Sequence, residues 1–439
     1  MIPATGSSSM RSSCRTLYEV AVVLLAGMTG ALWFARSGHT DPMQPSLQPR
    51  SYEERTGSVF LLVPKSPLQA PSVRELRLPP FADATSVWGA TGRDLRGRIW
   101  LGVSAQSSGM SAHLFQYDPE ADAWHDRGAV VVQLQAAGLY RQGEGQIKIH
   151  SKIIVADDGW LYFASTDEDG EHEDGTVLPR WGGHLWRLNP DNARWQHLLA
   201  VPEGLVAVSG VGRYVYALGY WGHVLYQYDT ATGKTKRTVV GSVGGHVSRN
   251  FLADVNGHVY VPRVTMQRGG KASAALVEYD SDLQELVATP LHFYLGPQES
   301  AKDNHGIVGL AYLADGHLVF TTHRGHLYLI ELQHGSPAKV TAIGWFHPKG
   351  ETYTPSLFAL DGHSLLAGVT QRGSRFEWVV FALQTRRATA LPLDTKGMHD
   401  VLLYGSVSRD HAGRFYVGGW AANQTGGQRP LVLQLNATP

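Results

Sequence analysis

The chain has 439 residues, of which 43% are hydrophobic and 17% are charged, a composition that supplies a sizeable core and excludes a disordered or coiled-coil chain. Its 38 lysines and arginines balance 38 aspartates and glutamates, so the basic surplus that nucleic-acid binding needs is missing. The single cysteine, Cys14, excludes an intrachain disulfide and a cysteine-ligated zinc site in the globular part.

The chain begins with an apolar stretch, Leu17 to Ala35, which contains one charge, Glu19, and follows Arg11 and Arg15. A helix of this length nearly spans a hydrocarbon core of roughly 30 Å. Residues 1–36 are therefore predicted to form a cytoplasmic stub and a transmembrane anchor, because the basic flank keeps the N-terminus inside. The rest would be extracytoplasmic, either periplasmic or extracellular. A cleaved signal peptide and a buried soluble helix are the alternatives.

Residues 37–72 contain six prolines, which interrupt regular structure and predict a tether. The globular part, residues 73–439, opens with a short alternating run, Val73 to Leu78, that belongs to no complete repeat.

A weak repeat follows, in which a turn glycine precedes a short apolar run, and its copies are 45 to 62 residues apart. The turn glycines are Gly97, Gly159, Gly212, Gly257, Gly316, Gly362 and Gly413. Apolar runs on both sides give four strands per copy, so the sequence predicts an all-β protein, a seven-bladed β-propeller. The last copy lacks its fourth strand, and Val73 to Leu78 is predicted to supply it and close the ring.

Two segments resemble the part of kelch-type repeats between the third and fourth strands. They are Tyr117-Asp-Pro with Trp124 and Leu188-Asn-Pro with Trp195. The resemblance implies the propeller architecture, and packing between blades is the simplest role of these aromatic residues.

Histidines recur just ahead of the first strand of a repeat. In a propeller, the connections entering the first strand and leaving the second strand of each blade open on one face, beside the central channel. The candidate residues at these positions are His150, Tyr220, His223, His246, Arg249, Arg263, His305, His323 and His399. Imidazole, guanidinium and aromatic groups together suit an anionic carbohydrate. The alternative is that each histidine only hydrogen-bonds the backbone of a neighbouring blade.

The longest such connection, Thr166 to Gly183, is strongly acidic from Asp167 to Asp174 and includes His172. Its carboxylates could bind Ca²⁺, but the spacing matches no EF-hand, and a solvated charge run is the simpler interpretation. The sequence predicts no other metal site and leaves any cofactor unknown. It contains no Walker loop, no H-E-x-x-H helix and no G-x-S-x-G elbow.

Three segments resemble histidine-bearing strands of seven-bladed polysaccharide lyases of the ulvan-lyase type. They are Lys148-Ile-His150-Ser-Lys-Ile, Tyr220-Trp-Gly-His223 and Gly245-His246-Val-Ser-Arg249-Asn250. The resemblance implies His150 or His172 as acid or base, Tyr220 as the proton-transfer partner and Arg249 as the clamp on a uronate carboxylate.

Two functions follow from these patterns. The first is a noncatalytic platform that binds an anionic glycan or an envelope protein at the channel mouth. The alternative is a carbon–oxygen lyase that removes the proton α to a uronate carboxylate and eliminates the 4-linked sugar, after arginine has neutralised that carboxylate. The sequence leaves open whether the protein is an enzyme.

Overall fold

The computed structural model describes residues 69–107, 109–172, 176–220, 222–243, 248, 250–395, 398, 400–423 and 426–436. The predicted anchor, residues 1–36, and the tether up to residue 68 lie outside these residues. Within the described residues, no helix is both long and apolar enough to cross a membrane.

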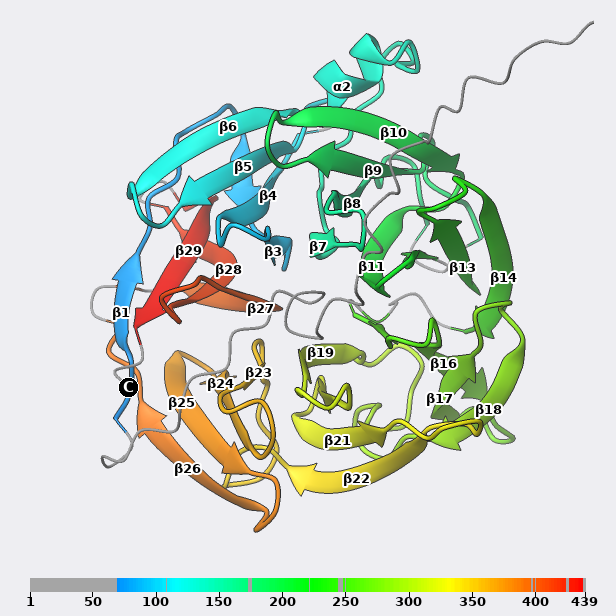
Figure 1. Cartoon of the computed structure of the whole chain (residues 1–439), viewed down its shortest axis with the longest axis vertical. Coiled ribbons are helices and arrows are strands. Elements are labelled where there is room, and N and C mark those ends of the chain that lie inside the picture. Colours follow the sequence, from blue (N-terminus) through cyan, green and yellow to red (C-terminus); the bar gives the residue numbers. More distant parts are fainter. Residues whose placement is uncertain are drawn as a thin grey trace, which may run out of the picture. The chain divides into compact units, whose positions relative to one another are not determined.

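Seven antiparallel sheets surround a central axis, as the sequence predicted (Figure 1). Blade 1 consists of β2 (Ala84–Ser86), β3 (Thr91–Arg93), β4 (Ile99–Ala105), β5 (His113–Asp118) and β6 (Ala123–Ala129). Blade 2 consists of β7 (Ile154–Val155), β8 (Leu161–Thr166), β9 (Gly183–Asn189) and β10 (Arg194–Val201). Blade 3 consists of β11 (Leu205–Val211), β12 (Tyr214–Gly219), β13 (Gly222–Asp229) and β14 (Thr235–Ser242).

The remaining blades follow the same order, from the inner strand to the outer strand. Blade 4 consists of β15 (Leu252–Ala253), β16 (Val259–Met266), β17 (Ala272–Tyr279) and β18 (Glu285–Pro290). Blade 5 consists of β19 (Ile307–Tyr312), β20 (Leu318–Thr322), β21 (His326–Glu331) and β22 (Lys339–Trp345). Blade 6 consists of β23 (Phe358–Ala359), β24 (Leu365–Arg372), β25 (Arg375–Ala382) and β26 (Arg387–Pro392). Blade 7 consists of β27 (Val401–Arg409), β28 (Phe415–Ala422), β29 (Gln428–Asn436) and β1 (Ser72–Glu75).

The ring is closed by the strand that the sequence left without a partner. β1 pairs antiparallel with β29, with Val73 opposite Leu435 and Glu75 opposite Leu433. The pairing continues past β1, because the Leu76 N–H donates to the Val432 carbonyl at 2.9 Å. The predicted closure is therefore confirmed, because the first described strand supplies the outer strand of the last blade and covers the edge of β29.

Seven hydrophobic clusters occur among the described residues, and each lies between two adjacent blades. The cluster between blades 7 and 1, for example, joins Leu76 and Trp124 to Tyr416. Successive side chains of each strand point to opposite faces of its sheet, so each blade packs against the blade on either side. The hydrophobic core is therefore a ring of interfaces between blades rather than one central body.

An aspartate fixes the turn between the first and second strands in blades 1, 4 and 7. Asp94, Asp254 and Asp410 stand three residues before the turn glycine, and each accepts a hydrogen bond from the backbone N–H four residues on. The second carboxylate oxygen accepts a hydrogen bond from an aromatic residue six positions on, at 2.7 to 2.8 Å; these residues are Trp100, Tyr260 and Tyr416. The turn glycines have φ of 79° to 84°, a conformation that favours glycine.

Two features of blade 1 depart from the simple repeat. Its first strand is interrupted between β2 and β3, and Trp88 lies in the interruption. A short helix, α2 (Val130–Ala136), follows β6 and lies at the rim of the ring in Figure 1. Both features lie next to the side chains described below.

Candidate functional site

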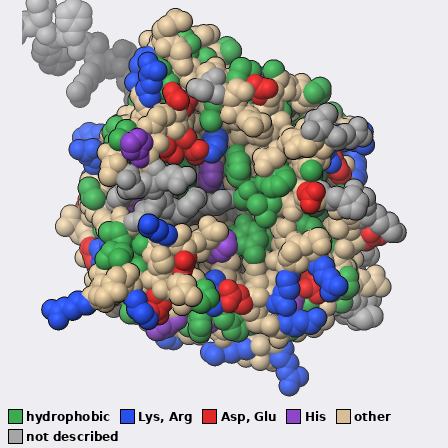
Figure 2. All heavy atoms as spheres, turned by 180° about the vertical axis from the view of Figure 1, so that it is seen from behind, with side chains coloured by type: hydrophobic (Ala, Val, Ile, Leu, Met, Phe, Trp, Pro, Cys, Tyr) green, Lys and Arg blue, Asp and Glu red, His purple; other side chains and the backbone are tan. Residues whose placement is uncertain are grey.

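The two faces of the ring differ in which connections they carry. The turns after first and third strands share one face, since residues 96–98, 118–120, 410–412 and 414 line a single pocket of about 270 Å³. The connections that enter the first strands and leave the second strands open on the other face. In Figure 2, which views one face from behind Figure 1, histidine side chains lie beside a hollow near the middle of the ring.

Aromatic and cationic side chains meet where blades 2, 1 and 7 adjoin. The Trp88 ring lies 4.7 Å from the Tyr404 ring and 6.3 Å from the His150 ring, measured between centroids. The Lys148 ammonium lies 5.2 Å from the centre of the Trp88 ring and forms an ion pair with Glu168. We call these five residues the aromatic–cation cluster.

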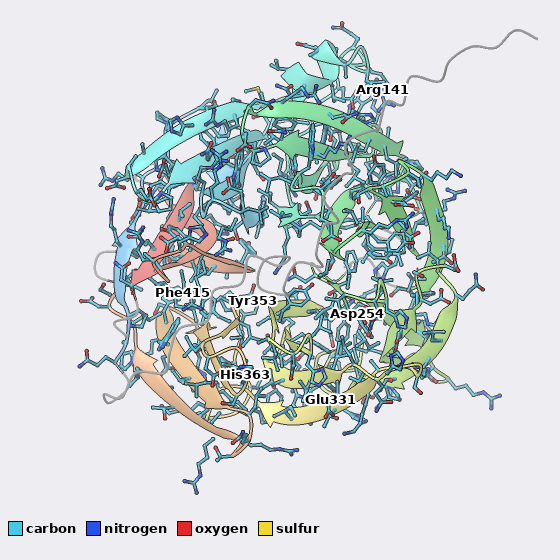
Figure 3. The ribbon with its side chains drawn as sticks, in the orientation of Figure 1. Arg141, Asp254, Glu331, Tyr353, His363 and Phe415 are labelled. Atoms are coloured by element: carbon cyan, nitrogen blue, oxygen red, sulfur yellow. The ribbon has the colours of Figure 1, made fainter. Side chains whose placement is uncertain are left out.

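The contacts extend from the cluster into blades 6 and 5. The Trp420 indole N–H donates to the Tyr404 hydroxyl at 3.2 Å, and the Tyr353 hydroxyl donates to the Leu403 carbonyl at 3.3 Å. Tyr353, which Figure 3 shows near the middle of the ring, lies 5.0 Å from the His323 ring. Side chains of five blades are thus linked around the inner edge on this face.

Lys152 lies in the connection that leads into β7 (Ile154–Val155). Its neighbour Ser151 accepts the Ala164 N–H at 2.8 Å and so faces its own blade, and Ile153 packs against Gly92 of blade 1. The Lys152 side chain is partly accessible to solvent, yet burial lowers its pKa to about 8. No carboxylate or hydrogen-bond acceptor of the described residues pairs with its ammonium group. Lys152 is therefore an enclosed cation beside the aromatic–cation cluster.

Two predicted histidines contact backbone carbonyls across blade interfaces. His150 Nδ1 lies 3.0 Å from the Val206 carbonyl oxygen of blade 3, and His223 Nδ1 lies 3.4 Å from the Pro262 carbonyl oxygen of blade 4. An oxygen acceptor requires the proton on that nitrogen, so the contacts select one tautomer of each ring. Burial lowers the pKa of His223 to about 4, which keeps it neutral at pH 7. These contacts match the alternative in which the histidines connect neighbouring blades.

The other predicted site residues have varied surroundings. His305 is buried, with Nδ1 2.6 Å from the Asp303 carbonyl oxygen, and its charge contributes to the lowered pKa of His223. Arg263 forms a two-bond ion pair with Glu285 at 2.8 and 2.9 Å.

Tyr220 packs against the core between blades 3 and 4, and its N–H donates to the Gly204 carbonyl at 2.8 Å. His172 is exposed in the acidic loop. His246, Arg249 and His399 lie outside the described residues.

A buried hydrogen-bonded chain lies in blade 2, near α2, and the sequence did not predict it. Glu144 Oε1 is 3.1 Å from His184 Nε2, and His184 Nδ1 is 3.0 Å from His197 Nε2. Burial opposes ionisation of Glu144, but hydrogen bonds from His184 and Arg141 lower its pKa overall. Arg141 lies at the rim beside α2 in Figure 3. Burial and the neighbouring His184 lower the pKa of His197 to about 4, so the chain ends in a neutral imidazole.

Asp167, at the start of the acidic loop, is buried with a charge that is poorly compensated. Its Oδ1 accepts the Asp169 N–H at 2.6 Å, whereas Oδ2 has no hydrogen-bond partner among the described residues. Burial, together with the nearby carboxylates of Asp169, Glu144 and Glu168, raises the pKa of Asp167 to about 6. Within the described residues, no three metal-binding side chains gather into a site, and the predicted Ca²⁺ loop extends into residues 173–175, outside that part.

We expect Asp167→Asn to stabilise the protein at neutral pH. The folded-state pKa lies above the unfolded value of about 3.8, so the stability that protonated Asp167 provides at low pH is lost as the pH rises from about 4 to about 6. At pH 7.5 the substitution should raise the free energy of unfolding by about 2 kcal/mol, with little gain at pH 4. Denaturant unfolding at the two pH values measures this. The exposed Asp157→Asn is the control, and an equal gain at both pH values would exclude the explanation.

No protein-family model and no curated protein matches the chain. Among solved structures, U3-55K aligns with 83% of this chain and 99% of its own, at 14% identity and a TM-score of 0.49. A protein of unknown function from Dyadobacter fermentans aligns with 84% of this chain and 100% of its own, at 13% identity and a TM-score of 0.48. The periplasmic gluconolactonase of Pseudomonas aeruginosa aligns with 77% of this chain and 96% of its own, at 14% identity and a TM-score of 0.45. At these values the likenesses carry no argument about activity or location.

Proposed function

We propose that the protein is an extracytoplasmic platform, held at a membrane by Leu17 to Ala35, that binds an anionic glycan or protein at the channel mouth. The observation that carries this proposal is Lys152, an enclosed ammonium group with no anionic partner among the described residues. Removing a cation from water without a counter-charge is unfavourable. A bound carboxylate or sulfate would offset this desolvation cost, which no described residue of the protein offsets.

The surroundings of Lys152 also suit a ring-shaped ligand. Trp88 is partly exposed, and Tyr353 and His323 lie partly exposed farther around the same inner edge. Flat aromatic faces pack against the apolar faces of sugar rings, while ammonium groups bind their carboxylates. Lys148 differs from Lys152 because Glu168 already neutralises it. Lys152 is therefore the cation that a ligand would engage.

The contact of His150 does not decide between the platform and the lyase. A ring that donates its Nδ1 proton to the Val206 carbonyl of the next blade carries its basic lone pair on Nε2, so the same contact fits a structural histidine and an oriented general base. A screen for lyase activity on uronate polysaccharides, followed by the ultraviolet absorbance of the unsaturated product, tests the alternative directly. Product from the parent protein would replace the platform proposal.

We expect Lys152→Met to weaken binding of a uronate polysaccharide about tenfold, since one charge-assisted contact is lost. Polygalacturonate is a suitable probe, with affinity measured by titration calorimetry. Parent affinity should also fall as the pH rises above about 8, because the Lys152 ammonium then loses its proton. Lys234→Met is the matched control, since Lys234 is exposed in a turn between β13 and β14. Equal affinity in the two variants would contradict the role of Lys152.

A further inference from the structure

Two arginines occupy the same position in adjacent blades, at the opposite end of the channel from the aromatic–cation cluster. Arg93 is the last residue of β3 and Arg409 the last residue of β27, and each directly precedes a turn aspartate. Both lie in the local pattern Arg-Asp-x-x-Gly-Arg, at residues 93–98 and 409–414. The first strands line the channel and end at the turns of the other face, so the pair lies at that end of the inner wall.

The two arginines are in direct contact. Arg93 Nη1 donates to the Arg409 carbonyl oxygen at 3.3 Å. The Arg409 guanidinium lies over the Phe415 ring, with its carbon 4.7 Å from the ring centre, and Figure 3 shows Phe415 in blade 7. Arg93 Nε is buried and has no hydrogen-bond partner among the described residues. Because the backbone carbonyl is neutral, this hydrogen bond does not neutralise the positive charge of Arg93.

The nearest carboxylates are occupied by other partners. Asp94 Oδ2 accepts hydrogen bonds from Arg98 Nε at 2.6 Å and from the Trp100 indole at 2.8 Å. Asp410 Oδ2 is held in the same way by Arg414 Nε and the Tyr416 hydroxyl. Neither aspartate forms an ion pair with Arg93 within the described part of the chain, although both attract it at longer range.

The electrostatic consequence is that two partly buried cations repel each other. Burial lowers the pKa of Arg93, and burial together with the charge of Arg93 lowers the pKa of Arg409 to about 10. Guanidinium groups nevertheless stay charged at pH 7. The guanidinium of Arg93, enclosed beside a second cation, is unfavourable unless an anion lies with it, and planar guanidinium groups bind the paired oxygens of carboxylate and phosphate groups well.

We propose that Arg93 and Arg409 form a binding site for a small oxyanion, a phosphate or carboxylate group, at the inner edge of blades 1 and 7. The site is separate from the platform face and does not depend on the proposed function. Its ligand is either a free inorganic ion or the charged end of a small molecule that enters the channel from the turn face.

The test is a thermal-unfolding series on the full chain with sulfate, inorganic phosphate or glycerol phosphate added to a chloride buffer. The parent protein should be stabilised by at least one of these anions in a saturable way, and Arg93→Met should weaken the anion about tenfold or more. In chloride alone, Arg93→Met should unfold at a temperature equal to or above that of the parent, since one of two like charges is removed. A preference for glycerol phosphate over inorganic phosphate would identify a small-molecule ligand rather than a free ion.

Two further variants keep the result interpretable. Lys234→Met, which removes a cation exposed in a turn, should retain the anion effect in full, which shows that the effect needs Arg93 and not positive charge alone. Arg93→Lys keeps the charge without the planar fork, and it should fold and bind with intermediate affinity if Arg93→Met does not fold. The proposal is overturned if no anion stabilises the parent protein, or if Arg93→Met responds to the anions as the parent does.

Discussion

Replacing residues 72–76 of the full chain with a glycine–serine linker should lower the free energy of unfolding by about 5 kcal/mol and cause aggregation on heating. The replaced segment contributes the outer strand of blade 7, and Leu76 is 4% exposed in the cluster between blades 7 and 1. Lost burial of Leu76 is worth roughly 1.5–3 kcal/mol, and the half-buried Val73 and the lost ladder bonds add to it. The total is comparable with the whole stability of many domains.

Differential scanning calorimetry and light scattering measure this effect. The matched control replaces residues 44–48 of the predicted tether with the same linker, which should leave the unfolding temperature unchanged. Without the outer strand, the edge of β29 is exposed and can pair with strands of other chains. This pairing explains the expected aggregation. An unfolding temperature equal to that of the control would show that β1 is dispensable for closing the ring.

The closure of the ring by β1 was predictable because each strand involved has a recognisable local sequence pattern. Turn glycines followed by alternating apolar residues set the number of blades, and an orphan run at one end matched a missing strand at the other. The predicted segment was Val73 to Leu78, and the observed strand is Ser72–Glu75 with one further bond at Leu76. The shift of a residue or two is usual, since alternation fixes faces better than ends.

The side-chain clusters were less predictable, because their members meet only through the closed ring. Arg93 and Arg409 are 316 residues apart, and Glu144 and His184 are 40 apart. A repeated Arg-Asp-x-x-Gly-Arg pattern marks the first pair, but the meaning of that pattern depends on blades 1 and 7 being neighbours. No local period marks Trp88, since it lies where the first strand of blade 1 is interrupted.

The histidines show why residue type alone does not specify a site. Their positions ahead of first strands or after second strands were predicted from the sequence, and the described contacts of His150 and His223 are with backbone carbonyls of the next blade. Lys152, two residues after His150, was not singled out, because a lone lysine has no distinctive spacing. Its burial, which lowers the pKa of its ammonium group, is produced by the folded ring and not by the local sequence.

The second large effect is expected at the turn aspartate of blade 4. Asp254 is 2% exposed, and its carboxylate accepts hydrogen bonds from the backbone N–H groups of Asn256 and His258 and from the Tyr260 hydroxyl. Asp254→Ala leaves these donors without an acceptor in a buried turn. We therefore expect a loss of about 3 kcal/mol in the free energy of unfolding.

Urea unfolding of Asp254→Ala, Tyr260→Phe and the double variant measures the coupling between the two side chains. The double variant should be less destabilised than the sum of the singles, because removing either partner already breaks the bond at 2.8 Å. Asp280→Ala is the matched control: Asp280 also accepts two backbone N–H groups, at 2.8 and 2.9 Å, but in a more exposed turn without a buried phenol among its described partners. If the turn carboxylate acts only locally, both alanine variants should lose the same amount. A larger loss at Asp254, with coupling to Tyr260, would show that the repeated aspartate connects the turn to the buried core of its blade.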